Sequence, residues 1–463
     1  MIVLQQVAVK FEGRVALFVS DLKIEQEDSI LLTGLSGSGK TIFAKAILGQ
    51  VFHGGIIDKN PQLKIGWVPQ QHPFRNLSNV QDFYYQQRFQ SQDAEDAPTL
   101  QYLLNQQFSS STLSTSSWLA DLHLLPLLDK PLIQLSNGEN KRAQIALALY
   151  ENPQLLILDS PFIGLDIEGR ATLTQILGRI KRSGVQILLT GDDRDIPEWI
   201  SHVVYLEGGI ASEKKSVSDY KSKHAAVSLE NLALPEIESE PAHYAFSEAV
   251  SFKNIRVSYG ANTIVENISW TVKKGSRWTL RGANGAGKST LLSLITGDHP
   301  QAYANQIYLF DKKRGSGESI WDIKKKIGYV SPELHVYFSK VCTCLETIGS
   351  GIFDTIGLFK RLTEEQDLLV RQWLKVFQLE AVADKPLYLL SLSQQRLALL
   401  ARALIKNPPL LILDEPCQGL DSNQTTFFNA VIDQLCKDPE KTLIYVTHYS
   451  DQLPGCVTRE KLL

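Results

Sequence analysis

The chain repeats one order of motifs twice, and the spacing between the motifs agrees in the two copies. A glycine-rich segment of the pattern GxxxxGK[ST] occurs at residues 34–41 and again at residues 282–289. An aromatic residue, Phe11 or Tyr259, lies 23 positions before the first glycine of each segment. A repeat of this length predicts two similar domains formed by one chain.

A second pair of segments follows each glycine-rich segment. LSNGE at residues 135–139 begins 24 positions before the aspartate that ends LLILD at residues 155–159. LSLSQ at residues 390–394 has the same distance to the aspartate of LLILD at residues 410–414. A short apolar run that ends in an acidic residue is typical of a buried strand.

Each half therefore predicts a strand, a glycine loop, a helix, a long insertion, a second helix and a buried strand, which is an α/β order with a parallel sheet. The strands before the loops are expected at residues 29–33 and 277–281. The helices after the loops are expected at residues 42–48 and 291–295.

The two copies are expected at residues 1–215 and 248–463. The segment between them, residues 216–247, is polar, carries charges of both signs and contains Pro235 and Pro241. Such a composition is typical of a linker.

Composition excludes several classes of protein. A content of 43% hydrophobic and 21% charged residues is that of a globular chain rather than a collagen-like, mucin-like or disordered one. The net charge of −3 gives no bulk attraction to nucleic acid or anionic lipid. The chain has no run of about 18–20 apolar residues and no secretory signal at its start, so a cytoplasmic location is expected. Five cysteines without metal-ligand spacing indicate reduced thiols.

The glycine-rich segments have the composition of phosphate-binding loops. A glycine turn points successive backbone N–H groups at phosphate oxygens, and the following helix adds its positive dipole end. Lys40 and Lys288 are expected at the terminal phosphates. Carboxylate and hydroxyl oxygens suit Mg²⁺, and the predicted metal ligands are Thr41, Ser289, Asp159 and Asp414. The predicted ATP-binding residues are Gly34, Leu35, Ser36, Gly37, Ser38, Gly39, Lys40 and Thr41 in the first half, and Gly282, Ala283, Asn284, Gly285, Ala286, Gly287, Lys288, Ser289 and Thr290 in the second.

The LSxG-type pentapeptides between the phosphate loops and the aspartate strands resemble the signature of ATP-binding cassette (ABC) ATPases, and the resemblance covers nearly the whole chain twice. It implies two P-loop nucleotide-binding domains, each with a RecA-like core and a helical subdomain, that bind ATP with Mg²⁺ and hydrolyse it. In that family two cassettes pack head to tail, so that each ATP lies between the phosphate loop of one and the signature of the other. The implied signature residues are Ser136, Gly138, Ser391 and Ser393.

The resemblance assigns catalysis unequally to the two halves. In cassettes that hydrolyse ATP, a glutamate after the aspartate orients or deprotonates the attacking water; it is Glu415 in the second half. The first half has Ser160 there, whose hydroxyl is no general base at neutral pH. The switch histidine of the family corresponds to His448, whereas the first half has Gly191.

Head-to-tail pairing would gather the losses at Ser160, Gly191 and Ser393 in one site. The site with Glu415 and His448 would keep the family's residues. One weak or non-hydrolytic ATP site and one active site are therefore predicted, with the two cassettes pairing within one chain. Pairing between chains is the alternative.

Further roles follow from the same resemblance. Gln70 corresponds to the glutamine that senses Mg²⁺ and couples to partners, but the second half has Pro332 at that position. The D-loop residues implied are Asp166 and Asp421. Phe11 and Tyr259 are predicted to stack on adenine, with a place in the core as the alternative.

Segments 296–301, 314–318 and 320–325 resemble a subfamily of bacterial tandem ABC proteins associated with molybdate transport. This implies an ATP-binding component for uptake of molybdate or a related oxyanion, docked on integral membrane permease subunits at the inner face of the plasma membrane. The alternatives are a cassette protein that acts on a ribosomal or nucleic-acid repair partner, although the chain has no strong nucleic-acid signal, and a non-hydrolytic ATP-gated clamp.

Overall fold

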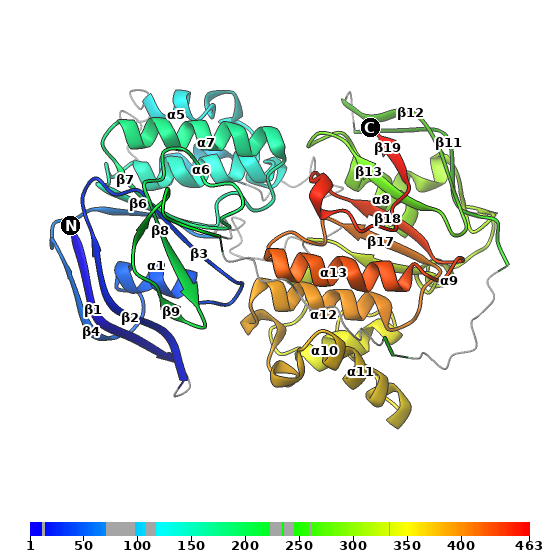
Figure 1. Ribbon diagram of the computed structural model, residues 1–463. Helices are drawn as coiled ribbons and strands as arrows, with labels where there is room; N and C mark the ends of the chain where they lie inside the picture. Colours follow the sequence, from blue (N-terminus) through cyan, green and yellow to red (C-terminus); the bar gives the residue numbers. More distant parts are fainter. Residues whose placement is uncertain are drawn as a thin grey trace. The chain divides into compact units, whose positions relative to one another are not determined.

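The computed structural model describes residues 1–11, 14–70, 98–107, 117–222, 234–235, 245–259, 262–332 and 334–463. These residues form two compact units (Figure 1). The first unit contains the described residues up to Ser222, and the second contains those from Leu234 onward.

The first unit is built on one mixed sheet in the order β4-β1-β2-β9-β8-β3-β7-β6-β5, with β10 paired to β8. Its parallel part, β5-β6-β7-β3-β8, carries the buried apolar runs, and β1 and β2 form an antiparallel hairpin. The strands are β1 (Ile2–Phe11), β2 (Arg14–Ile24), β3 (Ile30–Gly34), β4 (Gly54–Lys59), β5 (Ile65–Val68), β6 (Leu155–Asp159), β7 (Gln186–Thr190), β8 (His202–Glu207), β9 (Ile210–Ala211) and β10 (Lys215–Ser216).

Helices cover both faces of this sheet because every residue of β6 is buried and successive side chains alternate between the faces. Leu155 and Ile157 pack in the apolar cluster that contains α1 (Lys40–Leu48), whereas Leu156 and Leu158 pack in the cluster of α6 (Asn137–Leu149) and α7 (Ile167–Arg182). The remaining helices of the unit are α3 (Leu100–Gln107), α5 (Ser117–Asp121) and the 3₁₀ turns η1 (Leu125–Leu127) and η2 (Leu132–Gln134).

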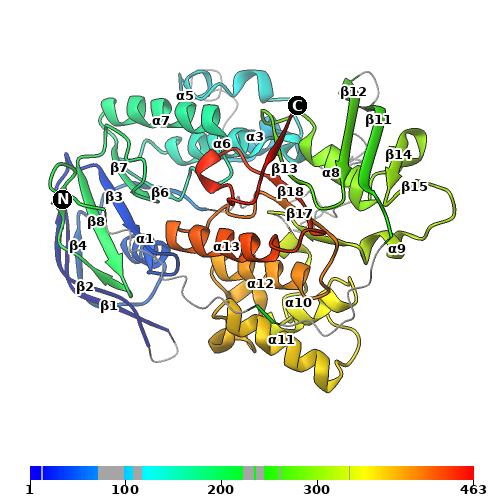
Figure 2. The same cartoon turned by 45° about the vertical axis from the view of Figure 1, so that its right-hand side comes forward.

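The second unit repeats the parallel core as a separate five-stranded sheet, β16-β17-β18-β13-β19, beside a four-stranded antiparallel sheet, β12-β11-β14-β15 (Figure 2). The core order matches β5-β6-β7-β3-β8 strand for strand. The strands are β11 (Glu248–Tyr259), β12 (Asn262–Lys273), β13 (Arg277–Arg281), β14 (Gln306–Leu309), β15 (Lys312–Lys313), β16 (Ile327–Val330), β17 (Leu410–Asp414), β18 (Thr442–Val446) and β19 (Arg459–Leu462).

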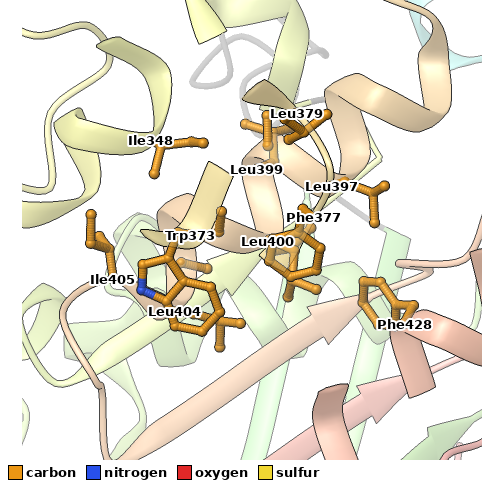
Figure 3. Close-up of a cluster of buried hydrophobic side chains, with 14 of the residues drawn as sticks. Ile348, Trp373, Phe377, Leu379, Leu397, Leu399, Leu400, Leu404, Ile405 and Phe428 are labelled. Carbon is orange, nitrogen blue, oxygen red and sulfur yellow. The ribbon is translucent and has the colours of Figure 1, made fainter. Parts of the chain in front are cut away.

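A helical layer packs beside the parallel sheet of the second unit. Trp373 of α11 and Phe377, the residue after its end, stack with ring centroids 5.8 Å apart and pack in one apolar cluster with Leu400 of α12 and Phe428 of α13 (Figure 3). The helices are α8 (Lys288–Thr296), α9 (Ile320–Lys324), α10 (Cys344–Gly349), α11 (Glu364–Val376), α12 (Leu392–Leu404) and α13 (Ser422–Leu435), with 3₁₀ turns η3 (Pro300–Ala304), η4 (Leu334–Tyr337), η5 (Ser350–Ile352), η6 (Glu380–Val382), η7 (Leu387–Leu389) and η8 (Ser450–Gln452).

The α/β order and its duplication are confirmed, with local differences. Both helices after the glycine loops begin earlier than expected, at Lys40 and Lys288, because the turn into the helix is made by a glycine in the left-handed region, Gly39 or Gly287. The strand expected at residues 29–33 is shifted by one residue, to Ile30–Gly34. The antiparallel strands were not part of the sequence prediction.

The predicted linker starts on the first unit. Ser216 is the last residue of β10, and Tyr220 donates a hydrogen bond of 2.6 Å from its hydroxyl to Asp193. The domain limits stay a prediction. No helix in the described ranges combines the length and the apolar character needed to cross a bilayer.

Candidate functional site

The loop after β3 has a shape that requires glycine. Gly34 has φ 142°, and a side chain there would lie 2.2 Å from the carbonyl oxygen of Leu206. Gly37 and Gly39 also have positive φ, 77° and 101°. The loop after β13 repeats this with Gly285 at 82° and Gly287 at 90°. Side chains at these turn positions would be strained, which favours glycine at each of them.

The side chain of the lysine in each loop forms hydrogen bonds with the backbone of the same loop. Lys40 Nζ donates to the carbonyl oxygens of Gly34 and Leu35 at 2.7 and 2.9 Å. Lys288 Nζ makes the same two bonds to Gly282 and Ala283, also at 2.7 and 2.9 Å. Each ammonium group is therefore held above the turn, where a bound phosphate would meet it.

The start of each following helix suits an anion. α1 and α8 are each nine residues long and begin after a glycine, which has no side chain to cap the first-turn amides, and neither helix has an acidic residue in its first turn. A side chain built at Gly37 or Gly285 would meet nothing within 4 Å, which leaves open space over both loops. Among the described residues, the buried Ser38 hydroxyl has no hydrogen-bond partner. These features fit a phosphate group.

Two predicted metal ligands lie together in the first unit. Thr41 Oγ1 donates to Asp159 Oδ2 at 2.7 Å, and Thr190 Oγ1 donates to the other carboxylate oxygen at 2.5 Å. The hydroxyl and carboxylate oxygens fit the oxygen ligands that Mg²⁺ prefers. In the second unit, Ser289 in α8 and Asp414 at the end of β17 hold the corresponding positions in their elements.

The two predicted catalytic residues of the second unit face each other. Glu415 follows β17 with φ 44°, and its N–H donates to the carbonyl of Val446 at 2.9 Å. Its Oε1 atom lies 3.1 Å from Nε2 of His448, close enough for an ion pair with a protonated ring but not aligned as a hydrogen bond. Its Oε2 atom accepts a hydrogen bond of 3.1 Å from the Gln418 side chain.

The first unit has the same backbone conformation at the position of Glu415 but no carboxylate there. Ser160 has φ 47°, and its hydroxyl lies 3.3 Å from Oγ1 of Thr190. Gly191 follows β7 and supplies no side chain; a Cβ there would meet Leu31 at 3.7 Å, an ordinary contact. The expected match of Gly191 to His448 is wrong by one residue: Asp159 pairs with Thr190 as Asp414 pairs with Val446, so Asp192 holds the position of His448.

The predicted signature serines cap helices. Ser136 caps α6 and accepts the N–H of Glu139 at 3.2 Å, while the Glu139 carboxylate accepts the N–H of Ser136 at 2.6 Å. Burial opposes ionisation of Glu139, but hydrogen bonds from Ser136 and Lys130 lower its pKa overall. Ser391 caps α12 in the same way, and its hydroxyl lies 3.1 Å from the hydroxyl of Ser393.

A side chain at the signature glycine is tolerated locally. A Cβ at Gly138 would lie 3.6 Å from Leu165, an ordinary contact, so the helix start itself does not demand glycine. Ser393 holds the position of this glycine in the second half, and its expected effect on ATP binding concerns the proposed composite site and stays a prediction.

Further predicted residues have structural partners. Asp166 caps α7 and Asp421 caps α13, accepting backbone N–H groups at 2.7 and 2.8 Å. The carbonyl of Gln70 accepts a bond of 3.1 Å from Lys141 Nζ. Pro332 follows β16 in the turn, at the position of Gln70.

Phe11 and Tyr259 end β1 and β11, and both are paired across the turn of an antiparallel hairpin. Their side chains lie outside the described part of the structure. Adenine stacking stays a prediction for both residues.

Three residues around these sites were missed by sequence reasoning: Thr190, Gln418 and Arg396. A comparison of the two halves offers a signal for Gln418, since the position four residues after the strand aspartate is Ile163 in the first half. Thr190 and Arg396 act through contacts between elements distant in sequence, which no motif reports.

Comparison with known proteins agrees with this geometry. The family model described as ABC transporter matches residues 17–163 and 265–418. The ABC transporter ATP-binding protein ModF of Escherichia coli is 36% identical over 96% of this chain and 92% of its own. An uncharacterized ABC transporter ATP-binding protein of Schizosaccharomyces pombe is 32% identical over 97% of this chain and 95% of its own.

Solved structures share the tandem fold. The structure titled as a model of ribosome-bound archaeal Pelota and ABCE1 aligns with a TM-score of 0.63 at 19% identity, covering 96% of this chain and 74% of that chain. Archaeal ribosome recycling factor aABCE1, in complex with the ribosomal stalk protein aP1, gives 0.57 at 19% identity, covering 98% and 89%. With two matches to the family model and relatives that align over nearly its whole length, the chain belongs to the ABC transporter family and is an ATP hydrolase with two cassettes in tandem.

Proposed function

We propose that this protein binds two ATP molecules at head-to-tail composite sites and hydrolyses mainly the one held by the phosphate loop of the second unit. The observation that carries the proposal is the contact between Glu415 and His448, at 3.1 Å, beside a loop that holds Lys288 over its carbonyls. In the first unit Ser160 stands at the position of Glu415 and Asp192 at the position of His448, so the pair of glutamate and histidine is missing there.

In the second unit each residue has a separate task. Lys288 and the amides at the start of α8 bind and neutralise the β- and γ-phosphates. Ser289 and Asp414 would hold Mg²⁺, which would neutralise negative charge on the phosphates. Glu415 orients a water molecule for in-line attack on the γ-phosphorus and accepts its proton, and ADP and phosphate are the products. His448 lies 3.1 Å from Glu415 and is expected to contact the γ-phosphate, as the switch histidine of the family does.

The first unit keeps the residues that bind ATP but lacks a general base for its hydrolysis. Lys40, Thr41 and Asp159 keep the phosphate and metal groups, so ATP binds. Loss of a general base costs about 10²–10⁴ in rate, so this ATP is expected to outlast many turnovers at the other site and to act as a structural ligand of the closed state.

The test compares two matched substitutions in the full chain. Glu415→Gln removes the base and is expected to lower kcat about 10²–10⁴-fold. Ser160→Ala changes the equivalent position of the first unit and is expected to leave kcat within about twofold. Equal losses from the two variants would contradict the proposed asymmetry.

For the biological role, we infer an ATP-binding component associated with uptake of molybdate or a related oxyanion, docked on a separate membrane permease. This inference is supported by sequence similarity to ModF and by the subfamily segments at residues 296–301, 314–318 and 320–325. The segment residues themselves make folding contacts. Arg314 and Glu318 form an ion pair of 3.0 Å with side chains only 1% and 7% exposed, and Lys324 pairs with Asp298 at 2.9 Å. These residues support common descent rather than oxyanion binding at those positions.

Capture from cells distinguishes the role from its alternative. A Glu415→Gln variant, which is expected to hold ATP, would be isolated from bacteria grown with and without molybdate. Recovery of an integral permease would support the transport role. Recovery of ribosomal or DNA-repair proteins instead would overturn it, in favour of a cassette protein that couples closure to a non-transport partner.

A further inference from the structure

A chain of side-chain contacts runs from Glu415 into the helical layer of the second unit. Gln418 donates from Nε2 to Glu415 Oε2 at 3.1 Å, and its Oε1 atom accepts from Nη2 of Arg396 at 3.2 Å. The other guanidinium nitrogen, Nη1, donates to the carbonyl of Ser331 at 3.0 Å. Arg396 is only 3% exposed. The amide of Gln418 is thus held at both ends.

The two ends of this chain belong to different elements. Gln418 lies between β17 and α13, whereas Arg396 lies in α12, five residues after its N-cap Ser391. Ser331 follows β16, the strand next to β17. The Glu415 side chain is therefore tied to the helix that begins with the signature serine and to the loop that begins at the edge strand.

The first half of the chain lacks the glutamate and the glutamine of this arrangement but keeps a basic residue at the position of Arg396. Counted from the matched motifs, Glu415 corresponds to Ser160, Gln418 to Ile163 and Arg396 to Lys141. An isoleucine side chain has no hydrogen-bonding group. Lys141 Nζ instead donates to the carbonyls of Pro69 and Gln70 at 2.9 and 3.1 Å.

The chemistry of an amide suits the task of orienting a base. One bond to Oε2 restricts rotation of the carboxylate and leaves Oε1 on the side of His448. The amide orients the carboxylate without placing a positive charge on it, because the charge of Arg396 is kept one residue away. A direct arginine contact would favour the ionised carboxylate and weaken it as a base.

We propose that Gln418 is a positioning residue for Glu415 and that Arg396 holds Gln418, so that helix α12 sets the orientation of the carboxylate in its own unit. The proposal rests on the function proposed above, in which Glu415 is the base. Arg396 and Gln418 touch no reacting atom in this account. Their effect reaches the reaction only through the angle and position of the carboxylate.

The test is a double-substitution cycle in the full chain. Gln418→Met removes the donor while keeping the side-chain length, and is expected to lower kcat about tenfold with KM for ATP unchanged within about twofold. In the Glu415→Gln background the same substitution is expected to cost no further rate, since no base remains to be oriented. Arg396→Lys is expected to fall between wild type and Gln418→Met, because lysine keeps the charge but cannot bond Gln418 and Ser331 in the same fork.

The matched control is Ile163→Met, at the equivalent position of the first unit, which is expected to leave kcat unchanged. Thermal unfolding and ATP binding measured on every variant separate misfolding from misalignment. Full activity of Gln418→Met, or an equal loss in the Glu415→Gln background, would overturn the positioning role. If Glu415→Gln itself keeps wild-type kcat, the assignment of the base has failed instead.

Discussion

Ser160 and Glu415 adopt the same left-handed backbone conformation, with φ of 47° and 44°, directly after the matching strands β6 and β17. Both amides donate to the neighbouring strand, Ser160 to the carbonyl of Thr190 at 3.1 Å and Glu415 to that of Val446 at 2.9 Å. The first unit has therefore kept the backbone that presents a catalytic side chain. What differs between the units is the side chains on that backbone.

Because the backbone is the same at both positions, we predict that a glutamate can be introduced at Ser160. The glutamate alone is not expected to restore ATP hydrolysis at the first site. Ser160→Glu, made in the Glu415→Gln background, is expected to fold normally and to leave kcat within about threefold of that background, because the first unit has Asp192 where the second has His448. Adding Asp192→His, at the residue that the strand register matches to His448, is expected to recover part of the activity. Recovery from Ser160→Glu alone would show that the base was the sole missing group.

The phosphate-loop lysines are predicted to differ in their effect on rate. Lys288→Ala removes a charge from the hydrolytic site and is expected to abolish turnover. Lys40→Ala is expected to weaken ATP binding to the first unit, and nucleotide-driven closure with it, while kcat at saturating ATP falls much less. Steady-state hydrolysis and fluorescence-detected nucleotide binding measure the two effects. Equal losses of kcat would argue against unequal sites.

Thr190 is predicted to stabilise the first unit through Asp159. Its hydroxyl is fully buried, donates to Asp159 at 2.5 Å and accepts the N–H of Ser160 at 2.9 Å. Thr190→Val keeps the shape but removes both bonds, and is expected to lower the free energy of unfolding by roughly 1–3 kcal/mol. The control is Thr447→Val, because the partners of Thr447 are neutral: its hydroxyl accepts the N–H of Tyr449 at 3.1 Å and has long bonds of 3.4 Å to the Tyr449 carbonyl and the Gln452 side chain. Urea unfolding would have to show a larger loss for Thr190.

Lys141 is predicted to make stability depend on pH in the alkaline range. Burial lowers the pKa of Lys141 from 10.5 to about 8. Between these two values the unfolded chain binds more protons than the folded one, so the free energy of unfolding rises with pH, and below about 8 this contribution is constant and unfavourable. Relative to Lys141→Met, the wild type is expected to gain roughly 1–3 kcal/mol between pH 8 and 10. Parallel curves for the two proteins would contradict this prediction.

The local parts of the fold and site could be predicted because their determinants are local. In both GxxxxGK[ST] segments the glycine before the lysine, Gly39 or Gly287, has positive φ, and LLILD is buried on both faces in both units. The hairpins of β1 with β2 and of β11 with β12 went unpredicted, since the loop motifs carry no information about strands that precede them.

Contacts between elements distant in sequence were also out of reach. Gln418 bonds Arg396 across 22 positions, and Thr190 bonds Asp159 across 31. Both contacts depend on how α12 and the parallel strands pack, which motif spacing does not encode. The sequence shows that the first half has Ile163 at the position of Gln418. The functional importance of this difference becomes clear only from the contact between Gln418 and Glu415.

The most direct measurement of the central claim is the nucleotide content of the protein after turnover. The chain would be loaded with radiolabelled ATP and Mg²⁺, separated rapidly from free nucleotide and quenched, and the bound ATP and ADP counted per chain. If the sites are unequal, about one ATP per chain is retained, at the first site, and ADP is found only at the second site. The Glu415→Gln variant is expected to hold no ADP. Conversion of both bound nucleotides to ADP at the same rate would contradict the account.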